Sequence, residues 1–121
     1  MSQTPEEIAL ERIRQAADSG AESLDLSNLG LTSLPSEIGQ LTNLTQLDVG
    51  LNRLVNLTSE IGQLTRLTKL KLDNNHLKVL PPKFWQLQNL IEFDLSNNKL
   101  VSLPAEILRL QNLKKLNLAE N

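Results

Sequence analysis

The sequence has no cysteine and no tyrosine, and it has a single histidine, His76. The missing cysteines exclude disulfide bonds, thiol catalysis and cysteine-ligated zinc sites. A single histidine also excludes a metal site built from several histidines. No G-x-x-x-x-G-K-[ST] phosphate loop and no kinase motif occurs. We therefore expect no catalytic residues, no metal and no cofactor, and we expect that the chain is not an enzyme.

Neither sign of charge dominates, because 12 lysines and arginines stand against 14 aspartates and glutamates. This balance argues against a nucleic-acid partner held by bulk positive charge. No stretch approaches the roughly 20 apolar residues of a membrane helix. Glu6 and Glu7 stand where a signal peptide needs a basic start and an apolar run. We expect a cytoplasmic protein with neither a nucleic-acid nor a membrane partner.

Aromatic residues are nearly absent, whereas leucine is in large excess. The chain has two phenylalanines, one tryptophan and 28 leucines among 121 residues. A core built from one residue type indicates one structural position that recurs many times. Apolar residues and asparagines do recur every 23 residues, in columns such as Leu24/Leu47/Leu70/Phe93/Leu116, Leu26/Val49/Leu72/Leu95/Leu118, Asn52/Asn75/Asn98/Asn121 and Ile38/Ile61/Phe84/Ile107.

These columns resemble the leucine-rich repeat, L-x-x-L-x-L-x-x-N-x-L. The resemblance covers residues 21–121, with four full units that begin at 21, 44, 67 and 90 and a partial fifth from 113. The second half of a unit, L-P-x-x-I-x-x-L, is similar to 23-residue units of bacterial repeat proteins, Roco-type GTPases and eukaryotic Ras-associated repeat proteins. The resemblance implies an α/β fold, a right-handed solenoid arc with a parallel sheet on its concave face.

The residue chemistry of each unit supports this fold independently. Leu47-Asp48-Val49 alternates apolar and polar residues, which is typical of a short strand with one buried face. The asparagine column marks a sharp turn, and its amides can satisfy unpaired backbone groups there. Leu29 takes this place in the first unit, so we expect the asparagine ladder to begin at Asn52. Thr58 replaces a proline of the return segment, and we expect that segment to be looser.

Residues 1–20 are expected to form a helix that caps the first repeat. Thr4-Pro5-Glu6-Glu7 has the pattern of a helix start, with Thr4 as N-cap and Glu7 closing a capping box. Gly20 stands where a helix commonly ends. The spacing predicts a helix over residues 5–18, and its buried face collects Ile8, Ala9, Ile13, Ala16 and Ala17.

The exposed positions between the buried leucines are the candidates for partner binding. Solenoids of this kind use their concave surface for binding, and the family resemblance implies a protein or peptide partner. The third unit carries a net charge of +3 and the first a net charge of −3, which suggests a dipolar surface with Lys69 and Lys71 as its basic anchor. The predicted partner-binding residues are Gln46, Asp48, Leu51, Lys69, Lys71, Asp73, Trp85, Glu92 and Asp94.

Three features depart from a uniform repeat. Asp25 and Asp48 fall in one column, where they could share a cation or raise one another's pKa. Leu51 is expected to be exposed where other units have asparagine. Trp85 replaces a glycine of the two preceding units, and we expect it to form an exposed apolar patch with Leu108 on the outer side.

The C-terminal repeat is expected to present an open face and an unpaired edge strand. Such an edge is a template for pairing, so a homodimer through this end is expected, with Leu113, Leu116 and Leu118 as its self-association residues. The leading hypothesis remains a non-catalytic protein-interaction module. The alternatives are a repeat segment of a larger signalling enzyme, such as a Roco-type GTPase or a kinase, and a structural unit that self-associates.

Overall fold

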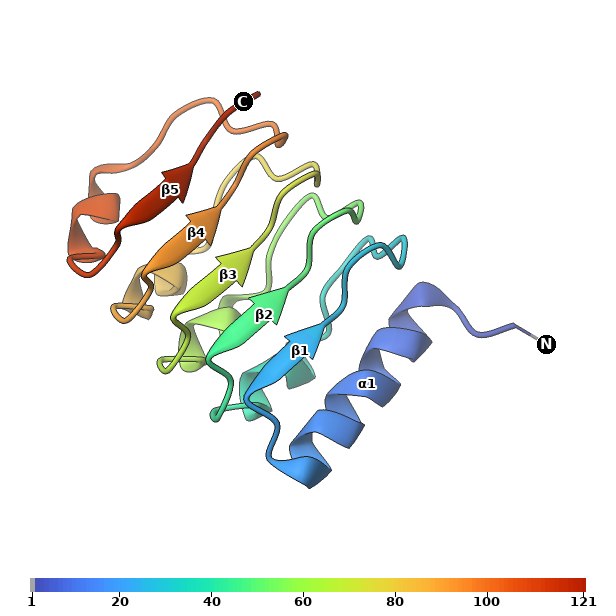
Figure 1. The fold of residues 1–121 in the computed structure, drawn as a ribbon. Coiled ribbons are helices and arrows are strands. Elements are labelled where there is room, and N and C mark those ends of the chain that lie inside the picture. The colour runs from blue at the N-terminus through green and yellow to red at the C-terminus, as the bar shows by residue number, and fades with distance from the viewer. Residues whose placement is uncertain (1) are drawn as a thin grey trace.

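The computed structural model describes residues 2–121. Figure 1 shows a curved stack of similar units with a helix across the N-terminal end. The helix is α1 (Pro5–Ser19), and the strands are β1 (Ser23–Asp25), β2 (Gln46–Asp48), β3 (Lys69–Lys71), β4 (Glu92–Asp94) and β5 (Lys115–Asn117). Each strand except β5 is followed by a 3₁₀ helix on the return segment: η1 (Ser36–Gln40), η2 (Ser59–Gln63), η3 (Pro82–Gln86) and η4 (Ala105–Arg109).

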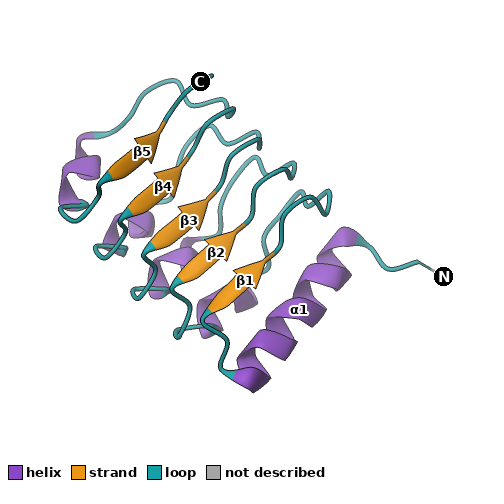
Figure 2. Ribbon diagram, viewed as in Figure 1, coloured by secondary structure: helices purple, strands orange, loops and turns teal. Residues whose placement is uncertain are grey.

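The five strands form one parallel sheet in the order β1-β2-β3-β4-β5. Each strand residue pairs with the residue 23 positions further along, as Leu24 does with Leu47 and Leu70 does with Phe93. The sequence period is therefore the strand register. Strands lie along one side of the arc and helical turns along the other, as Figure 2 shows, which confirms the expected α/β solenoid.

The N-terminal helix begins where the capping pattern predicts. The hydroxyl of Thr4 accepts a hydrogen bond from the backbone N–H of Glu7 (3.1 Å), and the carboxylate of Glu7 accepts one from the N–H of Thr4 (3.3 Å). Pro5 occupies the first turn, and Gly20 ends the helix in the left-handed conformation with φ 64°. This geometry confirms the capping box and the glycine stop.

The buried face of α1 is narrower than expected. Ala9, Ile13 and Ala16 are buried against the first repeat, whereas Ala17 is exposed. The prediction for Ala17 was wrong because consecutive helical residues point about 100° apart. Only one of the two neighbouring alanines can face the core.

The leucine columns form one continuous core between the sheet and the return segments. Most of their members are at most 6% exposed, and the exceptions are Leu24 in the first unit, Leu80 in the third and several members of the last two units. Two of the three aromatic side chains stack in this core, with the rings of Phe84 and Phe93 centred 5.0 Å apart. Phe84 also meets Trp85 edge to face, at 5.1 Å and 85°. No helix within residues 2–121 is long and apolar enough to cross a membrane.

The asparagine ladder begins at Asn52, as predicted, and runs through every later unit. The amide of Asn75 donates to the carbonyls of Val49 (3.0 Å) and Leu72 (3.2 Å), and its oxygen accepts from the N–H of Leu54 (3.0 Å). The carbonyl of Val49 also accepts from Asn52. Successive asparagines therefore share carbonyl acceptors, and the ladder links each turn to the next.

The return segments pack closely because two of their turns contain glycine. A Cβ on Gly62 would lie 2.3 Å from the carbonyl oxygen of Lys83, so only glycine permits this approach of η2 to η3. Thr58 does not loosen its segment, which contradicts our expectation. Its φ and ψ (−59°, 139°) match those of Pro35 (−57°, 140°), and its hydroxyl accepts from the N–H of Glu60. A side-chain cap thus replaces the rigidity of proline.

Candidate partner-binding surface

Two columns of side chains project from the exposed side of the sheet, because alternate residues of a strand point to opposite faces. The register brings together residues from all five strands. The first column is Ser23, Gln46, Lys69, Glu92 and Lys115, and the second is Asp25, Asp48, Lys71, Asp94 and Asn117. The predicted concave residues Gln46, Asp48, Lys69, Lys71, Glu92 and Asp94 therefore lie side by side.

Ion pairs run across the strands of this face. Lys69 lies 3.8 Å from Glu92, and Lys115 approaches the other oxygen of Glu92 at 3.9 Å. In the second column, Lys71 lies 3.8 Å from Asp48. All three pairs are at the long end of the ion-pair range and their side chains are well exposed. Such exposed pairs contribute little to stability.

The carboxylates of the second column hold the chain that follows each strand. Asp25 accepts hydrogen bonds from the N–H and the hydroxyl of Ser27 (2.8 and 2.6 Å), and Asp94 does the same with Ser96. The Ser27 hydroxyl above all, with the Ser27 N–H and the nearby charges of Arg12 and Lys71, lowers the pKa of Asp25. The pKa of Asp25 is therefore lowered, which contradicts the expectation that its neighbour in the column could raise it.

No group of three or more aspartates, glutamates and histidines within residues 2–121 is arranged to hold a metal ion. Asp25 and Asp48, which the sequence places in one column, have their carboxylates engaged elsewhere. Asp25 accepts from Ser27, and Asp48 accepts from the N–H of Gly50 (2.9 Å) and lies beside Lys71.

Two adjoining hollows lie along the sheet. One, of about 310 Å³, is bordered by β1, β2 and the two lysines of β3. The other, of about 550 Å³, extends from Lys69 and Lys71 across β4 to β5. Lys69 and Lys71 border both hollows, so the two lysines lie at the middle of the concave face.

Asp73 and Leu51 lie at the rim of this face. The Oδ1 atom of Asp73 is buried and has no hydrogen-bond partner, and it lies 2.5 Å from the position that a Cβ on Gly50 would take. Leu51 is 53% exposed and has a φ of 56°, where the equivalent residues of neighbouring units are asparagines. The expected exposure of Leu51 is confirmed, and its backbone adopts a conformation that leucine disfavours.

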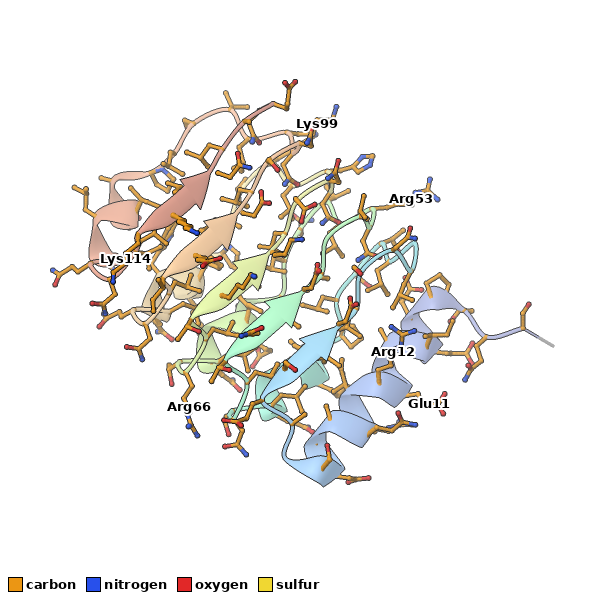
Figure 3. All side chains as sticks on the ribbon, viewed as in Figure 1. Glu11, Arg12, Arg53, Arg66, Lys99 and Lys114 are labelled. Atoms are coloured by element: carbon orange, nitrogen blue, oxygen red, sulfur yellow. The ribbon has the colours of Figure 1, made fainter. Side chains whose placement is uncertain are left out.

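Charged side chains also flank the sheet beyond both ends of its strands. Figure 3 shows Arg53 and Lys99 beyond the C-terminal ends of the strands, and Arg66 and Lys114 near their N-terminal ends. Lys114 and Lys115 both border the larger hollow, yet neither is among the predicted binding residues. The 23-residue column that contains Lys69 and Glu92 already leads to Lys115, so the signal for that residue was present in the sequence.

Trp85 lies away from the concave residues and is buried. It belongs to η3 on the return side and is only 3% exposed. The predicted exposed patch of Trp85 with Leu108 is therefore wrong in its first member, although Leu108 is 79% exposed. Trp85 packs edge to face against Phe84, and this contact turns the indole inward.

The three C-terminal leucines lie at the far end of the stack. Leu116 is 37% exposed in β5, and Leu113 and Leu118 are half-buried against the core. Within residues 2–121, β5 is hydrogen-bonded only to β4. The outer edge of β5 is therefore unpaired within the described chain.

Comparisons with known proteins agree with this architecture. The sequence model of the leucine rich repeat family matches residues 65–121. A search of curated proteins gave no match. Domains of this repeat family are generally protein-interaction modules and are typically non-enzymatic.

Solved structures with similar folds are also leucine-rich repeat proteins. A leucine-rich repeat protein of Leptospira interrogans is 40% identical, with a TM-score of 0.63 over 88% of this chain and 33% of that chain. The leucine-rich repeat domain of APL1B is 24% identical (TM-score 0.78, 100% of this chain and 36% of that chain). An internalin of Listeria monocytogenes is 23% identical (TM-score 0.81, 98% and 37%). The last two show the fold alone.

The chain spans about a third of the length of each of these solved structures. The family match, the 23-residue strand register and the asparagine ladder all lead to the same assignment. The chain is a leucine-rich repeat protein.

Proposed function

We propose that this chain is a non-catalytic module that binds a protein or peptide partner across its concave face. The binding surface centres on Lys69 and Lys71 of β3, with Asp48 and Asp94 on the neighbouring strands. The observation that carries the proposal is the set of exposed, weakly paired charges that the strand register aligns between two adjoining hollows. Extended concave surfaces of repeat proteins are used for binding in this way.

The charge pattern favours a partner with both signs of charge. On the exposed side of the sheet, β1 and β2 contribute Asp25 and Asp48, whereas β3 contributes Lys69 and Lys71. A partner with acidic groups over β3 and basic groups over β1 and β2 would complement this face. It would compete with exposed ion pairs 3.8 Å long, which are cheap to exchange because they are solvated.

The test is a comparison of two charge-reversed variants with the unchanged protein. Lys69→Glu/Lys71→Glu reverses the two central lysines, and Lys83→Glu/Lys99→Glu reverses two exposed lysines away from the concave strands. Immobilised proteins are exposed to a cell extract, and bound proteins are compared quantitatively. We expect the first variant to lose a partner that the second retains. Equal capture by all three proteins would refute the concave site.

A second candidate function is self-association through β5, which the unpaired edge of that strand favours. Antiparallel pairing with a second copy about Leu116 would set Lys115 against Asn117 of the other copy, so the lysines would not oppose each other. Sedimentation velocity over a hundredfold concentration range tests this: a single monomeric species throughout would refute it. A segment of a larger signalling enzyme would keep the same concave surface, so the charge-reversal test applies to that alternative unchanged.

A further inference from the structure

A groove on the return side separates the third and fourth repeats. It has a volume of about 440 Å³, which lies within the range of about 300–1,000 Å³ typical of ligand sites. Val79, Leu80 and Trp85 line it from the third unit, and Val101 and Leu103 line it from the fourth. None of these residues belongs to the sheet, so the groove is separate from the proposed concave site and does not depend on it.

The groove has a cause in the sequence. Gly39 and Gly62 let consecutive return turns approach so closely that a Cβ on either would lie under 3.0 Å from the next turn. Trp85 and Leu108 occupy the same position in the third and fourth units. By the same register Trp85 faces η4, where its side chain prevents this close approach, and η4 packs less closely on η3 than η3 does on η2. The indole of Trp85 thus acts as a spacer between the two turns.

The walls of the groove are apolar and partly open to solvent. Val79 is 59% exposed and Val101 is 93% exposed, whereas Trp85 is 3% exposed and is fixed against Phe84. Exposed apolar side chains around a preformed hollow mark surfaces that bind other molecules. The buried tryptophan gives the groove a rigid wall, which lowers the entropic cost of binding.

Two charged residues of opposite sign border the same groove. Lys78 and Glu106 both line it, and neither has an ion-pair partner within 4.0 Å among residues 2–121. We propose that this groove binds a peptide segment of a partner protein, which inserts an aliphatic side chain between the exposed Val79 and Val101. An acidic residue of the segment pairs with Lys78 and a basic residue pairs with Glu106.

The test uses short synthetic peptides and the single tryptophan of the chain. The peptides carry one, two or three leucines between an aspartate and a lysine, and matched peptides carry alanines in place of the leucines. Because Trp85 is the only tryptophan and there is no tyrosine, its emission reports directly on the groove. We expect a saturable change with at least one leucine peptide, at a Kd of about 1 mM or tighter, and none with the alanine peptides.

Three variants locate the binding. Val101→Asp places a charge in the apolar wall and is expected to weaken binding about tenfold; because Val101 is exposed, the fold should be retained, which circular dichroism checks. Lys78→Glu is expected to weaken binding about threefold and to favour a peptide with lysine at both ends. Lys69→Glu/Lys71→Glu on the concave face should leave peptide affinity unchanged. No saturable response to any leucine peptide, or full affinity in Val101→Asp, would overturn the proposal.

Discussion

Replacement of Asn75 by alanine should destabilise the protein far more than the same change at Asn121. Asn75 is 4% exposed and its side chain makes four hydrogen bonds, whereas Asn121 makes the same four types of bond at an exposed position. The two sites therefore match in chemistry and differ in solvent access. That difference isolates the contribution of a buried ladder.

The magnitude follows from what each substitution leaves unpaired. Asn75→Ala orphans the N–H of Leu54, whose residue is fully buried. The carbonyls of Val49 and Leu72 keep a second donor from Asn52 and Asn98. A buried unsatisfied polar group costs about 1–3 kcal/mol, so we expect the free energy of unfolding to fall by about 2 kcal/mol. Asn121→Ala should cost less than about 1 kcal/mol, because water can solvate the groups it frees.

The measurement is urea unfolding followed by circular dichroism and by the fluorescence of Trp85. The midpoint should shift to lower urea in Asn75→Ala while the slope of the transition stays constant, which indicates an unchanged unfolded state. Equal losses at positions 75 and 121 would refute the reasoning, because the ladder would then contribute nothing beyond solvated hydrogen bonds.

Three further predictions concern single positions. Gly62→Ala should lower the free energy of unfolding by about 1–3 kcal/mol, because its Cβ would overlap the rigid carbonyl of Lys83. Gly39→Ala should lower it less, because the nearest atom to its Cβ belongs to a flexible side chain; urea unfolding measures both. Leu51→Asn should raise stability by about 0.5–1 kcal/mol, since φ is 56° there, and it should weaken partner binding if Leu51 contacts the partner; equal stability would contradict the strain. The pKa of Asp25 is lowered in the folded state, so this residue stabilises the fold above its unfolded pKa of about 3.9 and that contribution is lost as pH falls through the folded value. When the pH is lowered below about 4, the free energy of unfolding should therefore fall less in Asp25→Asn than in the unchanged protein. Urea titrations at several pH values measure both.

The fold could be predicted from sequence because each column of the repeat corresponds to one fixed place in the solenoid. Leu47 and Leu70 are 23 residues apart and are also register partners, so the period carried the topology directly. The turn of the second unit was harder to predict. Proline restricts φ at this place in other units, whereas in the second unit the hydroxyl of Thr58 accepts a hydrogen bond from the N–H of Glu60 and supports the same turn.

The residues of the concave surface could also be predicted from the sequence, whereas the hydrogen-bond partners of their side chains could not. The columns predicted which charges are neighbours, and Lys71 does lie beside Asp48. They did not predict that Asp25 accepts from its own Ser27. Hydrogen bonds within a strand end compete with contacts between strands, and the period contains no information on which of the two wins.

The prediction of an exposed Trp85 was wrong because the repeat period also contains no information on how closely neighbouring units pack. A period assigns a position along each repeat but not the spacing between repeats, and a tryptophan in a glycine column changes that spacing. The third unit carries Lys69 and Lys71 on the concave face, and Trp85 lines the groove on its return side. Leu72 and Leu77 lie between these surfaces and are 0% exposed. Because a close-packed core of this kind deforms little, occupancy of one surface should leave the other intact, and a single partner or two different partners can use both at once.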